Sequence, residues 1–166
     1  MAVNVYLKFT EPDITGESTD SKHVGEISVL SWSHSFNQPT KATRSNAGGG
    51  TVEQANHSDF SFSKYLDTAT DDLMKYCWNG KQIGKATLTC YRSDGDDAAI
   101  LYLQIDMEDI IVSNISIGGG QGDLPTENIS LAYGKVTYTY KSQKPDTGDA
   151  GGVQPVSHDL IKQVVS

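Results

Sequence analysis

The sequence contains only two cysteines, Cys77 and Cys90. Their spacing matches no metal-binding motif. A free cysteine inside a fold behaves as a small apolar side chain. We therefore expect two reduced thiols in a cytoplasmic fold, and neither a disulfide nor a catalytic cysteine.

Long hydrophobic runs are also absent. The longest nearly apolar stretch covers residues 110–117, far fewer than the roughly 20 residues that a membrane-spanning helix needs. The first residues, MAVNVYLKFTEPD, show no basic region followed by an apolar segment, so the sequence predicts no secretory signal. We expect a protein that does not insert into membranes.

Positive charge is scarce. The chain has 13 Lys and Arg residues against 21 Asp and Glu residues, and its formal net charge is −8. The lysines are scattered, and no arginine-rich stripe occurs. Because nucleic-acid backbones and anionic membranes require a basic surface, this charge balance argues against both as the main partner.

Common catalytic motifs are missing as well. The sequence has no G-x-S-x-G, H-E-x-x-H or Walker pattern. Its histidines lie in separate segments, and none stands at ligand spacing from Cys, Asp or Glu; they are His23, His34, His57 and His158. We expect no catalytic residue, no cofactor and no metal ligand, although spacing does not address ligands that the fold brings together.

The glycine-rich segment GGGQGDLPTENISL (residues 118–131) raises the question of phosphate binding. A dinucleotide fingerprint needs G-x-G-x-x-G between a strand and a helix. Counted from Gly118, the sixth position is Asp123, and the residues after Pro125 are strand-like. Without a helix N-terminus to hold an anion, we interpret this segment as a connector between two strands.

Most of the sequence alternates apolar and polar residues with a period of two, as in residues 3–9, which predicts β-strands. The alternation changes phase within residues 24–37 and again within 128–140, which we interpret as long bulged strands. Such strands are typical of barrels and of orthogonally packed sheets. The prediction is a mostly β fold, a β-barrel of two packed antiparallel sheets, in a single domain over residues 1–166.

One α-helix is predicted beside these sheets, over about residues 68–79. Thr68 is the predicted N-cap, and Gly80 ends the helix. An apolar stripe at a spacing of four indicates the face that packs on the core. The stripe consists of Leu73, Met74, Cys77 and Trp78.

The remaining segments are predicted to be turns and loops. Asp94-Gly95-Asp96 suggests a hairpin turn, and residues 38–57 and 142–153 suggest two long polar loops with glycines. Loops of this length in a compact domain are often functional. The final residues, HDLIKQVVS, are strand-like again, so we expect the C-terminus to return to a sheet.

Several motifs, in the same order, resemble the haemolysin-coregulated protein (Hcp) family of bacterial type VI secretion systems. They are LSWS (30–33), DFSFSKYLDTATDDLMKYCWNGK (59–81) and GGGQGDLPTENISLAYGKVTYTYKSQK (118–144), with the opening MAVNVYLKF and the loop TGESTDSKHVGEI. The resemblance covers essentially the whole chain and implies a β-barrel of two packed sheets with one flanking helix. It extends to the tail-tube proteins of contractile phages.

The resemblance implies a structural protein rather than an enzyme. Members of the family form homohexameric rings that stack into a hollow tube inside a contractile sheath, and contraction expels the tube with its tip spike. The rings also hold effector proteins in their lumen. This route implies a protein that is cytoplasmic before firing and secreted afterwards. A phage-type tail-tube protein without a secretion role is the alternative, and a small β-barrel enzyme is a less favoured one.

Two sets of contact residues are predicted, the first from the family resemblance and the second from the alternation of side chains together with that resemblance. In the family, the loop between the second and third strands helps to contact the next subunit or ring; here residues 38–57 take that position, with Lys41, Arg44 and Glu53 as candidate contacts. The second set follows from the alternation around Trp32, because residues on either side of an inward-facing tryptophan face away from the core. We expect this row to line the lumen and contact effectors, with the outer surface as the rival position. The row is Ser31, Ser33 and Ser35.

Overall fold

A computed structural model describes residues 3–39, 54–93, 99–143 and 150–166. Its elements in chain order are β1 (Val3–Thr10), β2 (Ile27–Ser28), β3 (Ser31–Ser33), β4 (Phe36–Asn37), β5 (Asn56–His57), β6 (Phe60–Tyr65), α1 (Ala69–Asn79), β7 (Ile83–Ser93), β8 (Ala99–Gly118), β9 (Thr126–Ala132), β10 (Lys135–Gln143), β11 (Ala150–Asp159) and β12 (Val164–Val165). The prediction of a mostly β fold with one α-helix is confirmed for this part of the chain.

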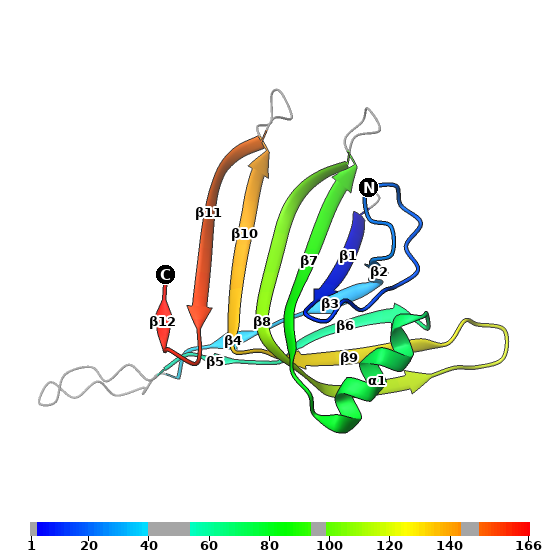
Figure 1. Cartoon of the computed structure of the whole chain (residues 1–166). Coiled ribbons are helices and arrows are strands. Elements are labelled where there is room, and N and C mark those ends of the chain that lie inside the picture. Colours follow the sequence, from blue (N-terminus) through cyan, green and yellow to red (C-terminus); the bar gives the residue numbers. More distant parts are fainter. Residues whose placement is uncertain (1–2, 40–53, 94–98, 144–149) are drawn as a thin grey trace, which may run out of the picture.

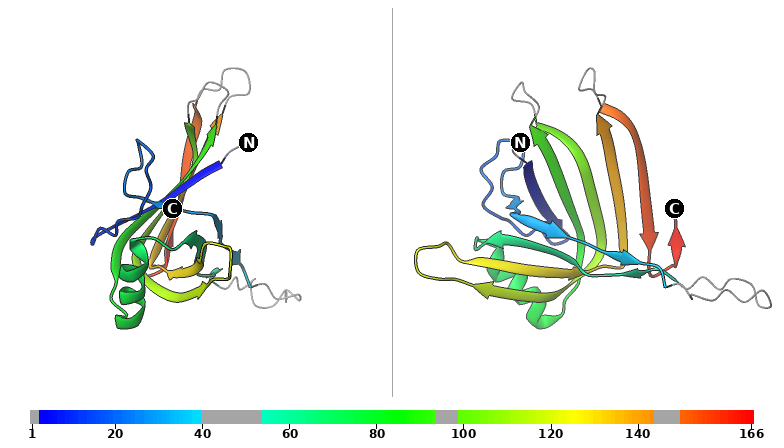
Figure 2. Two further views of the ribbon diagram at one scale, coloured as in Figure 1. Left: turned by 90° about the vertical axis from the view of Figure 1, so that its right-hand side faces the viewer. Right: turned by 180° about the vertical axis from the view of Figure 1, so that it is seen from behind.

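The strands form two layers that share β8 (Figure 1). The larger layer has the order β12-β11-β10-β8-β7-β1-β2, and the smaller layer consists of β3, β6, β9 and the second part of β8. All pairs are antiparallel, as predicted. The smaller layer and α1 lie across one end of the upright strands of the larger layer, while β4 and β5 form a separate two-stranded pair (Figures 1 and 2).

The long strand β8 forms the corner between the layers. It pairs with β10 as far as Glu108 and with β7 as far as Ile110, and from Ile111 onward it pairs with β9. Asp109, at this change of partners, has a positive φ of 55°, a conformation that bends a strand and that Asp tolerates better than most residues. One continuous strand therefore contributes to both layers.

The predicted arrangement of packed antiparallel sheets with one flanking helix is confirmed, although the strand order does not close into a complete ring of paired strands in the described structure. The free edges β2 and β3 do not pair with each other in the described structure, although the chain passes between them. The Val29 N–H donates to the Val5 carbonyl in the larger layer, and the Leu30 N–H donates to the Ser63 carbonyl in the smaller one. Between β2 and β3 the two layers are therefore joined by the chain itself, at Val29 and Leu30, and not by a pair of hydrogen-bonded strands.

The prediction of two long bulged strands, over residues 24–37 and 128–140, is wrong. Residues 24–37 contain β2, β3 and β4, of which β2 pairs with β1 and β3 pairs with β6. Residues 128–140 contain most of β9 and the start of β10, which are separated by Tyr133 and Gly134. In both cases the phase changes because the chain leaves one layer for the other, and not because a bulge interrupts one strand.

The C-terminal region contains more strand than predicted. Residues 150–153, which were assigned to a loop, begin β11. The predicted return of the C-terminus to a sheet is confirmed, since Val164 and Val165 of β12 pair with Asp159 and His158. The turn predicted at Asp94-Gly95-Asp96 lies outside the described residues.

A single apolar core lies between the layers and α1. Leu7, Leu88 and Ile105 form one cross-strand row of the larger layer and are fully buried. Phe62 and Ile129 form a row of the smaller layer and also face the core. Because successive strand residues point to opposite sides, the neighbours of these residues face outward, and they define the two outer surfaces of the molecule.

The apolar stripe of α1 is confirmed only in part. Leu73 is fully buried and Cys77 packs partly against the core, but Trp78 is 81% exposed. Gly80 ends the helix with a left-handed φ of 63°, as predicted. Cys77 and the buried Cys90 are both free, as predicted.

Asp67, and not Thr68, caps the N-terminus of α1. The Asp67 Oδ1 atom accepts a hydrogen bond of 3.0 Å from the Ala69 N–H, and the Asp67 N–H donates to Thr70 Oγ1 at 3.1 Å. The Thr68 hydroxyl makes no cap bond and donates instead to the Thr15 carbonyl. The cap residue thus lies one position earlier than the sequence pattern suggested.

This assignment predicts unequal effects of two neighbouring substitutions. We expect Asp67→Ala to lower the free energy of unfolding by at least about 1–2 kcal/mol, because it removes an N-cap acceptor and also an acceptor of the buried Lys64 ammonium group. Thr68→Ala removes a single exposed hydrogen bond, and we expect a loss within about 0.5 kcal/mol. Urea unfolding of the two variants measures the difference, and a larger loss for Thr68→Ala would contradict the assignment.

Candidate functional site

The outer face of the smaller layer carries two rows of small, uncharged polar side chains, which we call the polar grid. Each row crosses β3, β6, β9 and β8 by direct cross-strand pairing. The first row is Ser33, Ser61, Ser130 and Asn114, and the second is Ser31, Ser63, Asn128 and Ser116. The grid consists of serine and asparagine alone.

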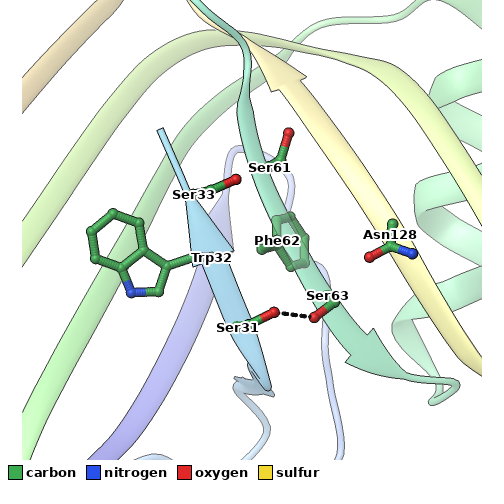
Figure 3. Close-up of a pocket in the computed structure, with 7 residues that line it drawn as sticks. All are labelled: Ser31, Trp32, Ser33, Ser61, Phe62, Ser63 and Asn128. Atoms are coloured by element: carbon green, nitrogen blue, oxygen red, sulfur yellow. Dashed lines mark hydrogen bonds between the residues drawn. The ribbon is translucent and has the colours of Figure 1, made fainter. Parts of the chain in front are cut away.

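Neighbouring members of the polar grid bond to one another across the strands. Ser31 Oγ lies 2.5 Å from Ser63 Oγ, and Ser61 Oγ lies 3.0 Å from Ser130 Oγ. Figure 3 shows a shallow hollow here, into which Ser31 and Ser63 converge and beside which Asn128 lies. The surface is therefore rich in hydroxyl groups, with donors and acceptors close together.

The other side of the same strands faces the core. Trp32, Phe62, Ile129 and Ile115 form the intervening row, and the Trp32 ring stacks on Phe60 with centroids 5.8 Å apart. The prediction that Trp32 packs inward is thus supported by the structure, and Ser31 and Ser33 are exposed on the opposite side. The two serines lie where the alternation placed them.

The remaining predicted contact residues do not join the polar grid. Ser35 lies beyond the end of β3; it is exposed, and its N–H donates to Ser58 Oγ at 2.9 Å. It lines a second hollow that adjoins the grid at Ser33 and Ser61. Lys41, Arg44 and Glu53 lie outside the described residues.

The charged residues of β6 and β9 point inward, beneath the polar grid. Lys64 and Glu127 are a cross-strand pair, both side chains are 0% exposed, and Lys64 Nζ forms an ion pair with Glu127 Oε1. Lys64 Nζ also donates to Asp67 Oδ1 at 2.7 Å and to Thr70 Oγ1 at 3.1 Å, which ties α1 to the smaller layer. The usual arrangement of an antiparallel sheet, with charges outside and apolar groups inside, is reversed at these two positions.

Sequence reasoning did not identify this buried ion pair. Lys64 and Glu127 are far apart in the sequence, and a lysine or glutamate within an alternating strand ordinarily marks the solvent side. The only available signal was phase, because Lys64 shares the phase of Phe60 and Phe62, and Glu127 shares that of Ile129 and Leu131.

The arrangement suits contact rather than chemistry. The polar grid carries no formal charge, and the nearest carboxylate at its edge, Asp59, accepts a hydrogen bond of 2.6 Å from the Ser113 hydroxyl. In the described part of the chain, no group of three or more His, Cys, Asp or Glu side chains is placed to hold a metal ion. None of the described helices is long and apolar enough to cross a membrane.

The glycine-rich segment connects β8 to β9, as predicted. β8 ends at Gly118 and β9 begins at Thr126, and the two strands pair in register from Gly118–Thr126 inward. Gly122 has a φ of 94°, which a residue with a side chain rarely adopts. The segment is the loop of a hairpin that projects at one side of the molecule (Figure 1), so no helix N-terminus is available for a phosphate.

A family model described as "Type VI secretion system effector, Hcp" matches residues 6–140. The chain belongs to the Hcp family. It is 38% identical over 153 residues to protein hcp1 of Pseudomonas aeruginosa, covering 92% of this chain and 91% of that protein. Its fold is similar to that of Hcp1 from Salmonella typhimurium (28% identity, TM-score 0.79, all of both chains). It is also similar to a solved type six secretion system protein (28% identity, TM-score 0.87, 99% of this chain and 100% of that one).

Membership of the Hcp family makes this chain a protein of the type VI secretion system. The family is a structural one and not a family of enzymes. This agrees with a surface whose most distinctive feature is a field of small hydroxyl and amide groups. The family resemblance expected from the sequence motifs is thereby confirmed.

Proposed function

We propose that this Hcp protein is the subunit of the inner tube of a type VI secretion apparatus. Six copies form a ring, the rings stack within the contractile sheath, and contraction expels the stack together with the spike. Effector proteins travel in the lumen, where they contact the polar grid. The observation that carries this proposal is the combination of Hcp family membership with an uncharged polar surface on one face of the subunit.

Exposed apolar side chains at two opposite ends of the subunit support assembly into a ring. One set surrounds the β8–β9 loop and consists of Tyr65, Leu66, Ile117 and Leu124; the other surrounds the C-terminal strands and consists of Val156, Ile161, Val164 and Val165. Figure 1 shows these elements on opposite sides of the molecule. Two different surfaces at opposite ends favour head-to-tail contacts, which close into a ring when the rotation between neighbours allows it.

The polar grid supports a lumen position for the smaller layer. A lumen surface that first holds an effector and then releases it must contact the effector without binding its charged groups tightly. Serine and asparagine side chains hydrogen-bond to many partners, and they present no charge that a folded cargo would need to desolvate. By contrast, the outer face of the larger layer carries a row of alternating charges, which comprises Lys85, Glu108, Lys135 and Asp159.

The mass of the assembled protein tests the ring. Light scattering coupled to size exclusion should give a discrete species of six times the 18.0 kDa subunit. We expect Val165→Glu, within the C-terminal apolar set, to shift that species toward the monomer, because it places a charge in an apolar contact. Val24→Glu alters an equally exposed valine outside both sets and is the matched control. A monomer for the unmodified protein would contradict the proposal.

A further inference from the structure

Three of the four histidines meet in one hydrogen-bonded series with two tyrosines. This histidine–tyrosine chain runs Tyr138, His34, Tyr133, His57, His158. Its consecutive contacts are 2.5 Å (Tyr138 Oη to His34 Nδ1), 2.7 Å (His34 Nε2 to Tyr133 Oη), 2.6 Å (Tyr133 Oη to His57 Nδ1) and 2.7 Å (His57 Nε2 to His158 Nδ1). The members come from the β3–β4 link, β5, the β9–β10 link, β10 and β11.

A backbone carbonyl determines where the hydrogens lie. His34 Nε2 is 3.1 Å from the carbonyl oxygen of Ser58. Because a carbonyl only accepts, Nε2 carries the hydrogen, and Nδ1 of the neutral ring accepts from the Tyr138 hydroxyl. The His34 Nε2–H also faces Tyr133 Oη, whose own hydrogen is then directed to His57 Nδ1.

The same reasoning fixes the last link. Since Nδ1 of His57 accepts, its Nε2 carries the hydrogen and donates to Nδ1 of His158. Each of the four links then has one donor and one acceptor, with one proton on each imidazole. A further proton on Nδ1 of His158 would set two N–H groups against each other across 2.7 Å. Reversing every hydrogen in the chain would relieve this conflict, but it would turn the lone pair of His34 Nε2 toward the Ser58 carbonyl. The arrangement is therefore favoured while the histidines are neutral.

The surroundings also disfavour positive charge. The pKa of His34 is lowered from 6.5 to about 4, chiefly by burial and also by the neighbouring His57, against an opposing effect of the Ser58 carbonyl. Burial, with a contribution from His158, lowers the pKa of His57. The groups that act on the chain are its own members from β5, β10 and β11, and Asp59 from the β5–β6 link, whose carboxylate favours protonated His34 but does not outweigh burial.

The histidine–tyrosine chain is what joins the short β4–β5 pair to the larger layer. β4 and β5 contain two residues each and pair only with one another in the described structure. His57 of β5 reaches Tyr133 and His158, and Phe36 of β4 packs its ring against Tyr138 at 5.8 Å. Loss of the chain would remove these contacts between the pair and the larger layer.

We propose that the histidine–tyrosine chain is an acid-sensitive latch: protonation of its imidazoles breaks the chain and releases the β4–β5 pair from β10 and β11. All contacts of the latch lie within one subunit. The sign follows from the lowered pKa values. The stabilisation is complete above the ordinary histidine pKa of 6.5 and is lost as the pH falls toward about 4.

Amide hydrogen exchange on the full chain tests the latch. After correction for the intrinsic rate, protection of the Ser35 and Ser58 amides, which bond to one another's residues beside the β4–β5 pair, should fall at least about tenfold between roughly pH 7.5 and pH 5. Protection in the β1–β7 ladder, around Leu7 and Leu88, should stay within about twofold. Unchanged protection around Ser58 at the lower pH would overturn the proposal.

Two variants separate the latch from general acid sensitivity. In His158→Asn the amide oxygen can still accept from His57 Nε2–H but cannot be protonated, so the pH of opening should move down by about one unit. His23→Asn is the control, since His23 stacks on Tyr6 outside the chain and its loss should leave that pH unchanged. Opening at the same pH in His158→Asn as in the unmodified protein would overturn the latch.

Nitrogen NMR of the unmodified protein tests the hydrogen assignment without any substitution. At about pH 7.5 both His34 and His57 should be neutral with the hydrogen on Nε2. A hydrogen on Nδ1 of either ring, or a charged ring at that pH, would overturn the arrangement on which the latch depends.

Discussion

Replacing Lys64 with methionine is expected to lower the free energy of unfolding by about 3–5 kcal/mol, the usual cost of removing one partner of a buried ion pair. The lysine is 0% exposed and forms an ion pair with Glu127, which is also 0% exposed. Its ammonium group further contacts Asp67, Thr70 and the Tyr65 carbonyl. Methionine fills a similar volume but satisfies none of these groups, so two carboxylates lose their cation.

A second substitution distinguishes the lost charge from lost packing. In Lys64→Met/Glu127→Gln the buried carboxylate becomes a neutral amide that still accepts from the Thr70 hydroxyl. We expect the double variant to recover at least about half of the loss, because an unpaired buried charge costs much more than a buried amide. Glu127 Oε2 is buried without a hydrogen-bond partner in the described structure, so an added amide hydrogen at that position displaces no existing bond.

Guanidinium unfolding at a fixed subunit concentration measures these differences, since assembly would otherwise shift the apparent stability. Lys85→Met is the matched control. Lys85 is exposed and stands 4.0 Å from Glu11, and we expect its replacement to change stability by no more than about 0.5 kcal/mol. Equal losses for the Lys64 and Lys85 variants would contradict a buried role for the ion pair.

The strands could be predicted from the sequence, but their distribution between layers could not. Period-two alternation over residues 3–9 places β1 close to its actual position, Val3–Thr10. A change of phase, however, has two physical origins, a bulge within one strand and a passage from one layer to the other. Residues 24–37 and 128–140 are the second kind, and local sequence does not distinguish them because the inward side chains are apolar in both cases.

The bend of β8 at Asp109 could not be predicted from the local sequence either. Leu103, Ile105 and Met107 alternate toward the core, and the strand then bends at Asp109. Beyond it, residues 110–117 resemble a separate apolar run. The bend depends on which strands lie on either side of β8, and that information is carried by residues far away in the sequence.

The candidate surface was predicted only along one strand. Alternation around Trp32 placed Ser31 and Ser33 opposite the core. The other members of the polar grid became visible only once β6, β9 and β8 were in register. The histidine–tyrosine chain was not predicted. His34, His57 and His158 lie in three separate segments, the β3–β4 link, β5 and β11, and their spacing in the sequence follows no ligand motif.

The polar grid leads to the second large effect. We expect Ser31→Glu/Ser33→Glu to abolish effector retention, with a fall of about tenfold or more in the amount of effector that co-purifies with the rings. The two carboxylates would stand on the exposed face of β3, directly opposite Ser63 and Ser61. A cargo packed against them would have to desolvate both charges without a partner, which costs several kcal/mol.

Three measurements make this prediction specific to the lumen. Ser31→Ala/Ser33→Ala keeps the surface small and uncharged, and we expect it to retain the effector. Thr137→Glu/Thr139→Glu places the same two charges on β10, on the outer face of the larger layer, and should also leave retention unchanged. The hexamer mass should be preserved in all three variants.

Unchanged retention of the effector in Ser31→Glu/Ser33→Glu would show that these serines do not line the lumen. Loss of the ring in that variant would place the serines at a contact between subunits, because a buried charge at a subunit interface disrupts assembly itself.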